Sequence, residues 1–132
     1  MPIGTVGGGR QLGDGNLKEV VIGALAAPAT ATVTATLTSA QLSSMLLVAS
    51  PGTGAATYTL PTVALFDAAV SNAKIGSTVA LSIVNLGTSS GVITMAVGTG
   101  WTIVGLATIA VSTSAQFLAR KSGDTAWVLY RV

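Results

Sequence analysis

The sequence predicts an all-β domain in which antiparallel strands form a sandwich or barrel, with one short helix over about residues 62–73 and an extended N-terminal arm. Three observations support this prediction. Short apolar runs recur between residues 28 and 132, and turn-forming residues separate them. Several runs alternate apolar and polar residues, which is the period of a half-buried strand. One stretch alone combines a strong helix-start signal with apolar residues spaced three and four apart.

The stretch from Ala55 to Val84 carries most of the prediction. Ala56–Leu60 alternates as a strand, and Pro61 ends it because proline has no N–H to donate to a sheet ladder. Thr62 is the expected N-cap of the helix. A second strand is expected at Thr78–Val84. The apolar stripe of the helix and the inner face of the second strand must share one core. Their members are Val63, Phe66, Val70, Val79, Leu81 and Ile83.

Further elements are expected on both sides of this stretch. Thr30–Thr38 alternates threonine with apolar residues and predicts one continuous strand. The capping-box spacing of Thr38 and Gln41 predicts a single helical turn at Ser39–Ser43. Met45–Ala49 predicts a short apolar strand. The remaining strands are expected at Gly91–Val97, Trp101–Val104, Thr108–Val111, Ser114–Arg120 and Thr125–Val132.

Residues 1–27 are expected to form a Gly-rich N-terminal arm before a β-sandwich domain over residues 28–132. Glycine loses more conformational freedom on folding than any other residue, so we expect such an arm to be ordered only where a neighbour holds it. Within the arm, the pattern of Leu17–Ala27 leaves a helix and an edge strand both open. The candidate assembly contacts in the arm are Gly7, Gly8, Gly9 and Arg10.

Composition excludes several classes of function. The 132 residues include no cysteine and no histidine, which removes the commonest metal ligands and the commonest general base. Charged residues make up 8% of the chain, and the basic ones are scattered apart from Arg120-Lys121, so no cationic patch for nucleic acid is expected. Prolines and threonines interrupt every apolar run before the ~20 residues that a membrane helix needs. We expect no nucleic acid, membrane, metal or other cofactor as partner.

No arrangement of residues indicates an enzyme. Asp67 is expected in solvent near the start of the helix, and Asp124 in a hairpin turn. The Gly7–Gly9 run lacks the lysine and the spacing of a phosphate-binding loop. Asp14-Gly15-Asn16 opens like a calcium loop, but no glutamate closes it. We expect no catalytic residues and no small-molecule substrate.

The last strand is expected to be covered on both faces. Trp127, Leu129 and Arg131 share one face, and the opposite face is also largely apolar. In a small domain the second cover would be another subunit, so these three residues are candidate assembly contacts. The aromatic residues are expected in the core or in an interface rather than in a sugar-stacking platform.

Several motifs occur together in the domain. They are T-Y-T-L-P-T at residues 57–62, the helix to Ala73, K-I-G-S at 74–77, S-I-V-N at 82–85, G-V-I-T-M-A-V-G-T-G at 91–100 and Val104-Gly105. With these motifs, residues 30–132 resemble a small β domain of tailed-bacteriophage virion proteins, above all capsid decoration (cement) proteins, and also tail and baseplate components. The resemblance implies a trimer on the outer surface of a phage head and no catalytic residues.

We therefore expect a non-enzymatic structural protein with a jelly-roll-like sandwich. Its expected role is that of a capsid decoration or cement protein, a homotrimer that binds the major capsid protein on the outer capsid surface of the virion and stabilises contacts between capsomers. The alternative is a phage tail, fibre or baseplate component that binds a host-surface glycan through exposed aromatic side chains. A secreted adhesion module would require Val20–Ala27 to act in a signal peptide, which Glu19 and Gly23 disfavour.

Overall fold

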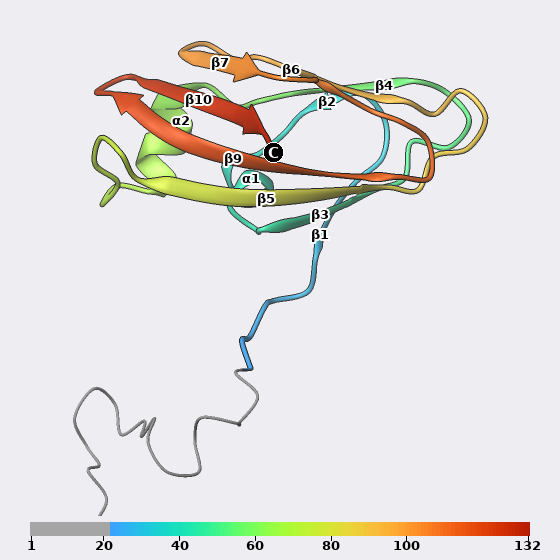
Figure 1. The fold of residues 1–132 in the computed structure, drawn as a ribbon, viewed down its shortest axis with the longest axis horizontal. Coiled ribbons are helices and arrows are strands. Elements are labelled where there is room, and N and C mark those ends of the chain that lie inside the picture. The colour runs from blue at the N-terminus through green and yellow to red at the C-terminus, as the bar shows by residue number, and fades with distance from the viewer. Residues whose placement is uncertain (1–21) are drawn as a thin grey trace, which may run out of the picture.

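The structure, a computed structural model, describes residues 22–132, which form two β-sheets that face each other around one core (Figure 1). The six strands of the larger sheet are, in spatial order, β1 (Ala29–Ala31), β3 (Leu46–Ala49), β5 (Thr78–Asn85), β9 (Ser114–Gly123), β10 (Ala126–Arg131) and β7 (Trp101–Val104). The smaller sheet consists of β2 (Ala35–Thr36), β4 (Ala56–Thr59), β6 (Ile93–Ala96) and β8 (Thr108–Ile109). The β-rich fold expected from the sequence is confirmed.

Consecutive strands alternate between the two sheets from β1 to β9. Each sheet therefore receives every second strand, and most neighbours within a sheet run in the same direction. Parallel pairs are β1–β3, β3–β5, β7–β10, β2–β4 and β4–β6. The expected antiparallel architecture is therefore wrong, since β5–β9, β9–β10 and β6–β8 are the antiparallel pairs of the described residues. Most turn signals in the sequence mark a change of sheet rather than a hairpin.

The strand expected at Thr30–Thr38 is divided between the two sheets. It contributes β1 to the larger sheet and β2 to the smaller one, and the chain crosses between the sheets at residues 32–34. The crossing is held by hydrogen bonds. The Tyr58 hydroxyl donates to the Thr32 carbonyl at 2.8 Å, and the Thr34 hydroxyl accepts from the Thr57 N–H at 3.0 Å. The alternation of threonine with apolar residues continues through the crossing, so the pattern gives no sign of it.

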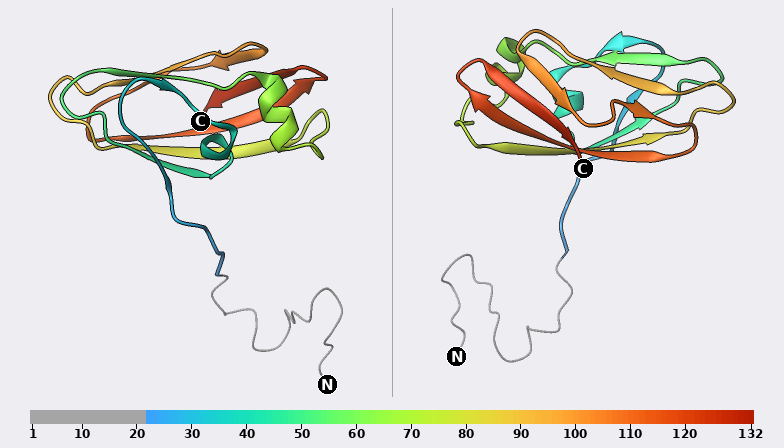
Figure 2. Two further views of the ribbon diagram at one scale, coloured as in Figure 1. Left: turned by 180° about the vertical axis from the view of Figure 1, so that it is seen from behind. Right: turned by 45° about the horizontal axis from the view of Figure 1, so that its top comes forward.

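The two helices start at threonines that the sequence identifies as caps. In α1 (Ser39–Leu42), Thr38 and Gln41 form the expected capping box. In α2 (Val63–Ala69), the Thr62 hydroxyl accepts from the Leu65 N–H at 3.3 Å. The helix expected over 62–73 ends earlier, because the backbone leaves the helical region at Val70. Figures 1 and 2 show α2 covering one end of the space between the sheets.

The core lies between the sheets and receives side chains from both of them and from the helices. The shared core expected for the helix and the strand after it is confirmed. Val63, Phe66, Leu81 and Ile83 are buried, and Val70 and Val79 pack against them at partial burial.

The end of the molecule opposite α2 is organised by Asn85, the last residue of β5, which is 1% exposed. Its side-chain amide donates to the carbonyls of Gly91 at 2.9 Å and of Ile109 and Ala110 at 3.1 Å. Its side-chain oxygen accepts from the Gly87 N–H at 2.8 Å. One buried amide thus ties the end of β5 to the loop before β6 and to β8.

Candidate functional site

The candidate site lies where the three parallel strands of the smaller sheet end. Because β2, β4 and β6 run in the same direction, the segments that follow them emerge at the same edge. Two of these segments lead into α1 and α2, and the third leads into the turn before β7. Between them lies an open groove with a volume of about 650 Å³. We call it the strand-end groove.

The strand-end groove is lined without any charged residue. Its apolar lining consists of Leu37, Leu60, Pro61, Leu65 and Val97. Leu65 is 61% exposed and Val97 is 51% exposed, so two large apolar side chains stand free in this part of the surface. The groove therefore offers apolar contact area that the chain itself does not cover.

Hydroxyl groups accompany this apolar lining. They belong to Thr36, Thr38, Ser39, Thr59, Thr62 and Thr99. A hydroxyl can both donate and accept a hydrogen bond. The groove can therefore hold an apolar side chain and also satisfy polar groups next to it, as the backbone of a bound peptide would require.

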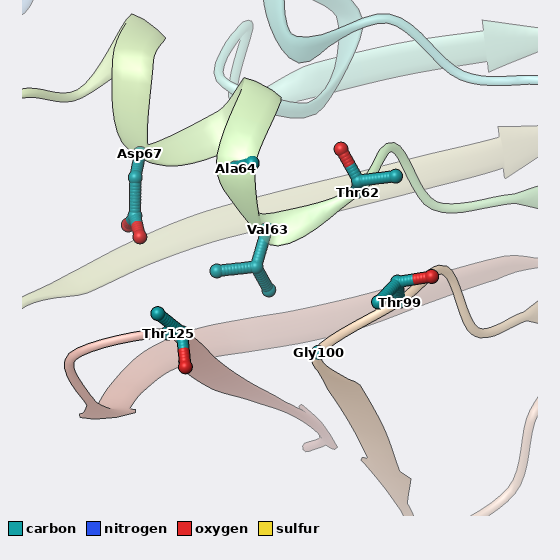
Figure 3. A pocket seen from close by; sticks show the side chains of 7 residues that line it. All are labelled: Thr62, Val63, Ala64, Asp67, Thr99, Gly100 and Thr125. Carbon is teal, nitrogen blue, oxygen red and sulfur yellow. The ribbon is translucent and has the colours of Figure 1, made fainter.

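A second depression of about 510 Å³ adjoins the groove and shares Thr62 and Thr99 with it. Figure 3 shows the Val63 side chain at its centre, and the Asp67 carboxylate reaching down from α2 on the side of Thr125. This depression contains the carboxylate of Asp67, which is the one ionisable group in its lining.

Beneath the second depression, three aromatic rings pack together in the core. Phe66 meets Trp127 edge to face, with ring centroids 4.8 Å apart, and lies 5.5 Å from Trp101. All three side chains are buried, as are Tyr58 and Phe117. Such aromatic packing stabilises the core and fixes the position of α2 against the strands that carry the two tryptophans. These five rings offer no exposed face on which a sugar could stack.

The Asp67 carboxylate holds this end of the molecule together. Its Oδ1 accepts from Lys121 Nζ and from Trp127 Nε1, both at 2.8 Å. Lys121 is 8% exposed and also donates to the backbone carbonyl of Asp124 at 3.2 Å. Burial raises the pKa of Asp67, but the hydrogen bonds from Lys121 and Trp127 and the Lys121 charge outweigh it, and the pKa lies below its ordinary value.

The expectation that Asp67 is merely solvated is therefore wrong. Its partners come from β9 and β10, more than 50 positions away in the chain. The carboxylate joins α2 to the larger sheet. Its role is structural, because one of its oxygens already accepts hydrogen bonds from two donors of that sheet. The neighbouring Trp101 indole N–H is buried without a hydrogen-bond partner.

The three candidate assembly contacts on the last strand, Trp127, Leu129 and Arg131, make their contacts within their own chain. Trp127 and Leu129 are fully buried, so their side chains have no surface to offer a second subunit. The guanidinium of Arg131 donates to the carbonyls of Leu106 at 3.1 Å and Thr108 at 2.9 Å. The structure therefore corrects the assignment of Trp127 and Leu129 as direct contacts. The contacts expected in the arm, Gly7, Gly8, Gly9 and Arg10, lie outside the described residues.

The sequence predicts no binding site at the groove, because the motifs at residues 57–62 and 91–100, which supply part of its lining, indicate only strands and turns. A signal was nevertheless present in α2, where Ala64, Leu65, Ala68 and Ala69 face outward without one polar side chain among them. An outward face of a helix is normally polar, so an outward face without a polar side chain is normally covered by another surface. The composition of its outer face therefore points to an interaction surface.

The described residues contain no group of three or more metal-ligating side chains. Within the same residues, no helix is long and apolar enough to span a membrane. Comparison of the chain with protein-family models, with curated proteins and with solved structures gives no match.

Proposed function

We propose that this protein is a capsid decoration (cement) protein that binds the outer surface of a phage head as a homotrimer, in contact with the major capsid protein. The observation that carries the proposal is a surface rich in exposed apolar side chains and poor in charge. The large apolar residues exposed in the described part are Ile22, Leu25, Val33, Met45, Leu65, Ile75, Leu86, Val97, Val104, Leu106 and Val132.

Few charges balance this apolar surface. The described residues contain six charged side chains, and three of them, Asp67, Lys121 and Arg131, are bonded within the chain. A protein surface with so little charge favours association with other protein surfaces over a monomer in solution. Burial of apolar area stabilises such contacts by roughly 25 cal/mol per Å². A shell component that is permanently covered by its neighbours meets this requirement.

The finer fold assignment belongs to the same proposal. We interpret the two facing sheets as a sandwich related to the jelly-roll-like domains of virion proteins. The support is the single core to which both sheets contribute. The burial of the five core aromatic rings favours decoration over the alternative of a tail or fibre protein with a glycan-stacking platform.

Binding to phage shells tests the proposed function. The purified chain is added to shells of its own particle from which it has been removed, and bound protein is recovered with the sedimented shells. We expect saturable binding and a higher temperature of shell disruption. Binding to isolated tails but not to shells would contradict the proposal.

The Gly-rich arm is proposed to clamp a neighbouring subunit or capsomer. A chain without Met1–Asn16 isolates this part of the proposal, because the deletion leaves all described residues in place. We expect lower shell occupancy for the shortened chain. Unchanged occupancy would refute the clamp while leaving the decoration role intact.

A further inference from the structure

The smaller sheet has a free edge at β8, because β8 pairs with β6 alone among the described strands. The Ala107 carbonyl accepts from the Met95 N–H at 2.9 Å, so Ala107 directs its backbone groups toward β6. Successive residues of an antiparallel strand direct these groups to opposite sides. The carbonyls of Leu106 and Thr108 therefore point away from β6. A row of such groups is a template for pairing with another chain.

Side chains of the larger sheet occupy these outward carbonyls. Arg131, the last residue of β10, donates from its Nη1 to the carbonyl of Leu106 at 3.1 Å and to that of Thr108 at 2.9 Å. The next outward carbonyl, that of Ala110, accepts from the Asn85 side-chain amide at 3.1 Å. Three consecutive acceptors on the free side of β8 are thus satisfied within the chain. We call this row of carbonyls the β8 edge.

Two further contacts fix Arg131 in this position. Its guanidinium carbon lies 5.5 Å from the centre of the Phe117 ring, which is within the range of a cation–π interaction. On the other side the backbone comes close at Gly105, where a Cβ would lie 2.9 Å from Arg131 Cβ. Gly105 also has φ of +99°, which favours glycine. The chain therefore makes room for Arg131 at this edge.

We propose that Arg131 blocks the β8 edge against pairing with a second copy of this chain. The guanidinium occupies carbonyls that an added strand would use, and a charged side chain directed into a sheet edge is one way in which natural proteins prevent such pairing. A second copy carries the same edge, and two identical edges can pair about a twofold axis. Leu106 is 61% exposed and Val104 is 48% exposed, so apolar contacts would strengthen the pairing once the edge were open.

Substitution of Arg131 by methionine tests this role, with the mass in solution measured by light scattering. Methionine keeps an apolar side chain beside Phe117 but has no N–H to donate, so the edge is opened. We expect the mass of Arg131→Met to rise to about twice that of the parent or more, because pairing of identical edges doubles an assembly. The matched control is Arg120→Met, which removes the same charge from an exposed position of β9. We expect this control to keep the mass of the parent.

A proline in β8 shows whether the new contact lies at this edge. Thr108 is the first residue of β8 and its N–H points away from β6, so proline at this position leaves the pairing with β6 intact and hinders pairing at the β8 edge. We expect Arg131→Met combined with Thr108→Pro to return to the mass of the parent, although none of the Arg131 hydrogen bonds is restored. Continued association of the double variant would overturn the inference, because the loss of Arg131 would then act through a loosened fold.

An unchanged mass for folded Arg131→Met, or equal association of Arg120→Met, would also overturn the inference. Circular dichroism checks that each variant is folded. If Arg131→Met loses the spectrum of the parent, Gly105→Ala decides, since its methyl displaces Arg131 without removing a charge or a donor. We expect Gly105→Ala to associate and Thr108→Pro to abolish that association, and the mass of the parent would refute the role of Arg131. All masses are compared with the parent, so the result does not depend on shell binding or on the proposed homotrimer.

Discussion

Replacement of Asp67 by alanine is the sharpest test of how the α2 end is held together. The substitution removes the acceptor shared by Lys121 Nζ and Trp127 Nε1, both at 2.8 Å. A buried donor left without an acceptor costs about 1–3 kcal/mol. Lys121 keeps its bond to the Asp124 carbonyl, and the Asp67 side chain is 26% exposed, so water can replace part of the loss. We expect a loss of about 2–4 kcal/mol in the free energy of unfolding.

Equilibrium unfolding in urea measures this loss, and two further variants identify its origin. Asp67→Asn keeps an oxygen that can accept from the Trp127 indole, so it should lose less than Asp67→Ala. Adding Lys121→Met to Asp67→Ala removes the uncompensated ammonium and should restore part of the stability. A loss below about 0.5 kcal/mol in Asp67→Ala, the level of an ordinary surface substitution, would refute this role of the carboxylate.

Three other predictions follow from the same structure. Because the pKa of Asp67 lies below its ordinary value of 3.8, its stabilisation is present above pH 3.8 and is lost as the pH falls through the folded-state pKa. The free energy of unfolding, measured by urea at a series of pH values, should therefore differ less between the parent and Asp67→Asn as the pH falls below 3.8. A difference that does not change with pH would contradict the ion pair. Asn85→Leu removes the side-chain partner of the Gly91 and Ile109 carbonyls and of the Gly87 N–H, while the Ala110 carbonyl keeps the Thr113 hydroxyl. The substitution should cost about 3 kcal/mol or more, seen as a lower thermal midpoint, and an unchanged midpoint would show that Asn85 is dispensable. Gly100→Ala should destabilise by about 1–3 kcal/mol, because φ is +91° and the new methyl would lie 2.7 Å from Val63 Cγ2, whereas Gly54→Ala meets open space and should be nearly neutral; equal effects would contradict this reasoning.

Local features of the fold could be predicted from the sequence because short-range chemistry determines them. The cap at Thr62, the capping box at Thr38 and the buried face of β5 all depend on residues a few positions apart. Such patterns report which residues form an element and which face is buried. They were confirmed with small shifts at the ends of elements, the largest of which is the early end of α2 at Ala69.

The pairing of strands could not be predicted in the same way. An alternating pattern shows that a strand is half-buried, but it does not show which sheet the strand joins. Thr30–Thr38 keeps its alternation while the chain crosses from one sheet to the other, so one predicted strand became β1 and β2. A turn between strands likewise fits a hairpin and a change of sheet equally well, which led to the incorrect antiparallel assignment.

The residues of the candidate site show the same difference between local patterns, which the sequence reveals, and long-range contacts, which it does not. Asp67 meets Lys121 and Trp127 only because α2 packs onto β9 and β10, and no local pattern announces a contact over 54 and 60 positions. The last strand was correctly seen as apolar on both faces, but Trp127 and Leu129 are covered by their own chain. The exposed Leu65 gave the one usable signal, since it belongs to a helix without a polar outer face.

Electron cryo-microscopy of the native particle that contains this chain is the decisive measurement for its role. We expect density for both sheets on the outer surface of an icosahedral shell, with three copies around a local threefold axis. The exposed side chains of Leu65 and Val97 should be covered there by another protein chain. Density confined to a tail or fibre, or copies that stand apart with the exposed apolar side chains open to solvent, would contradict the decoration role.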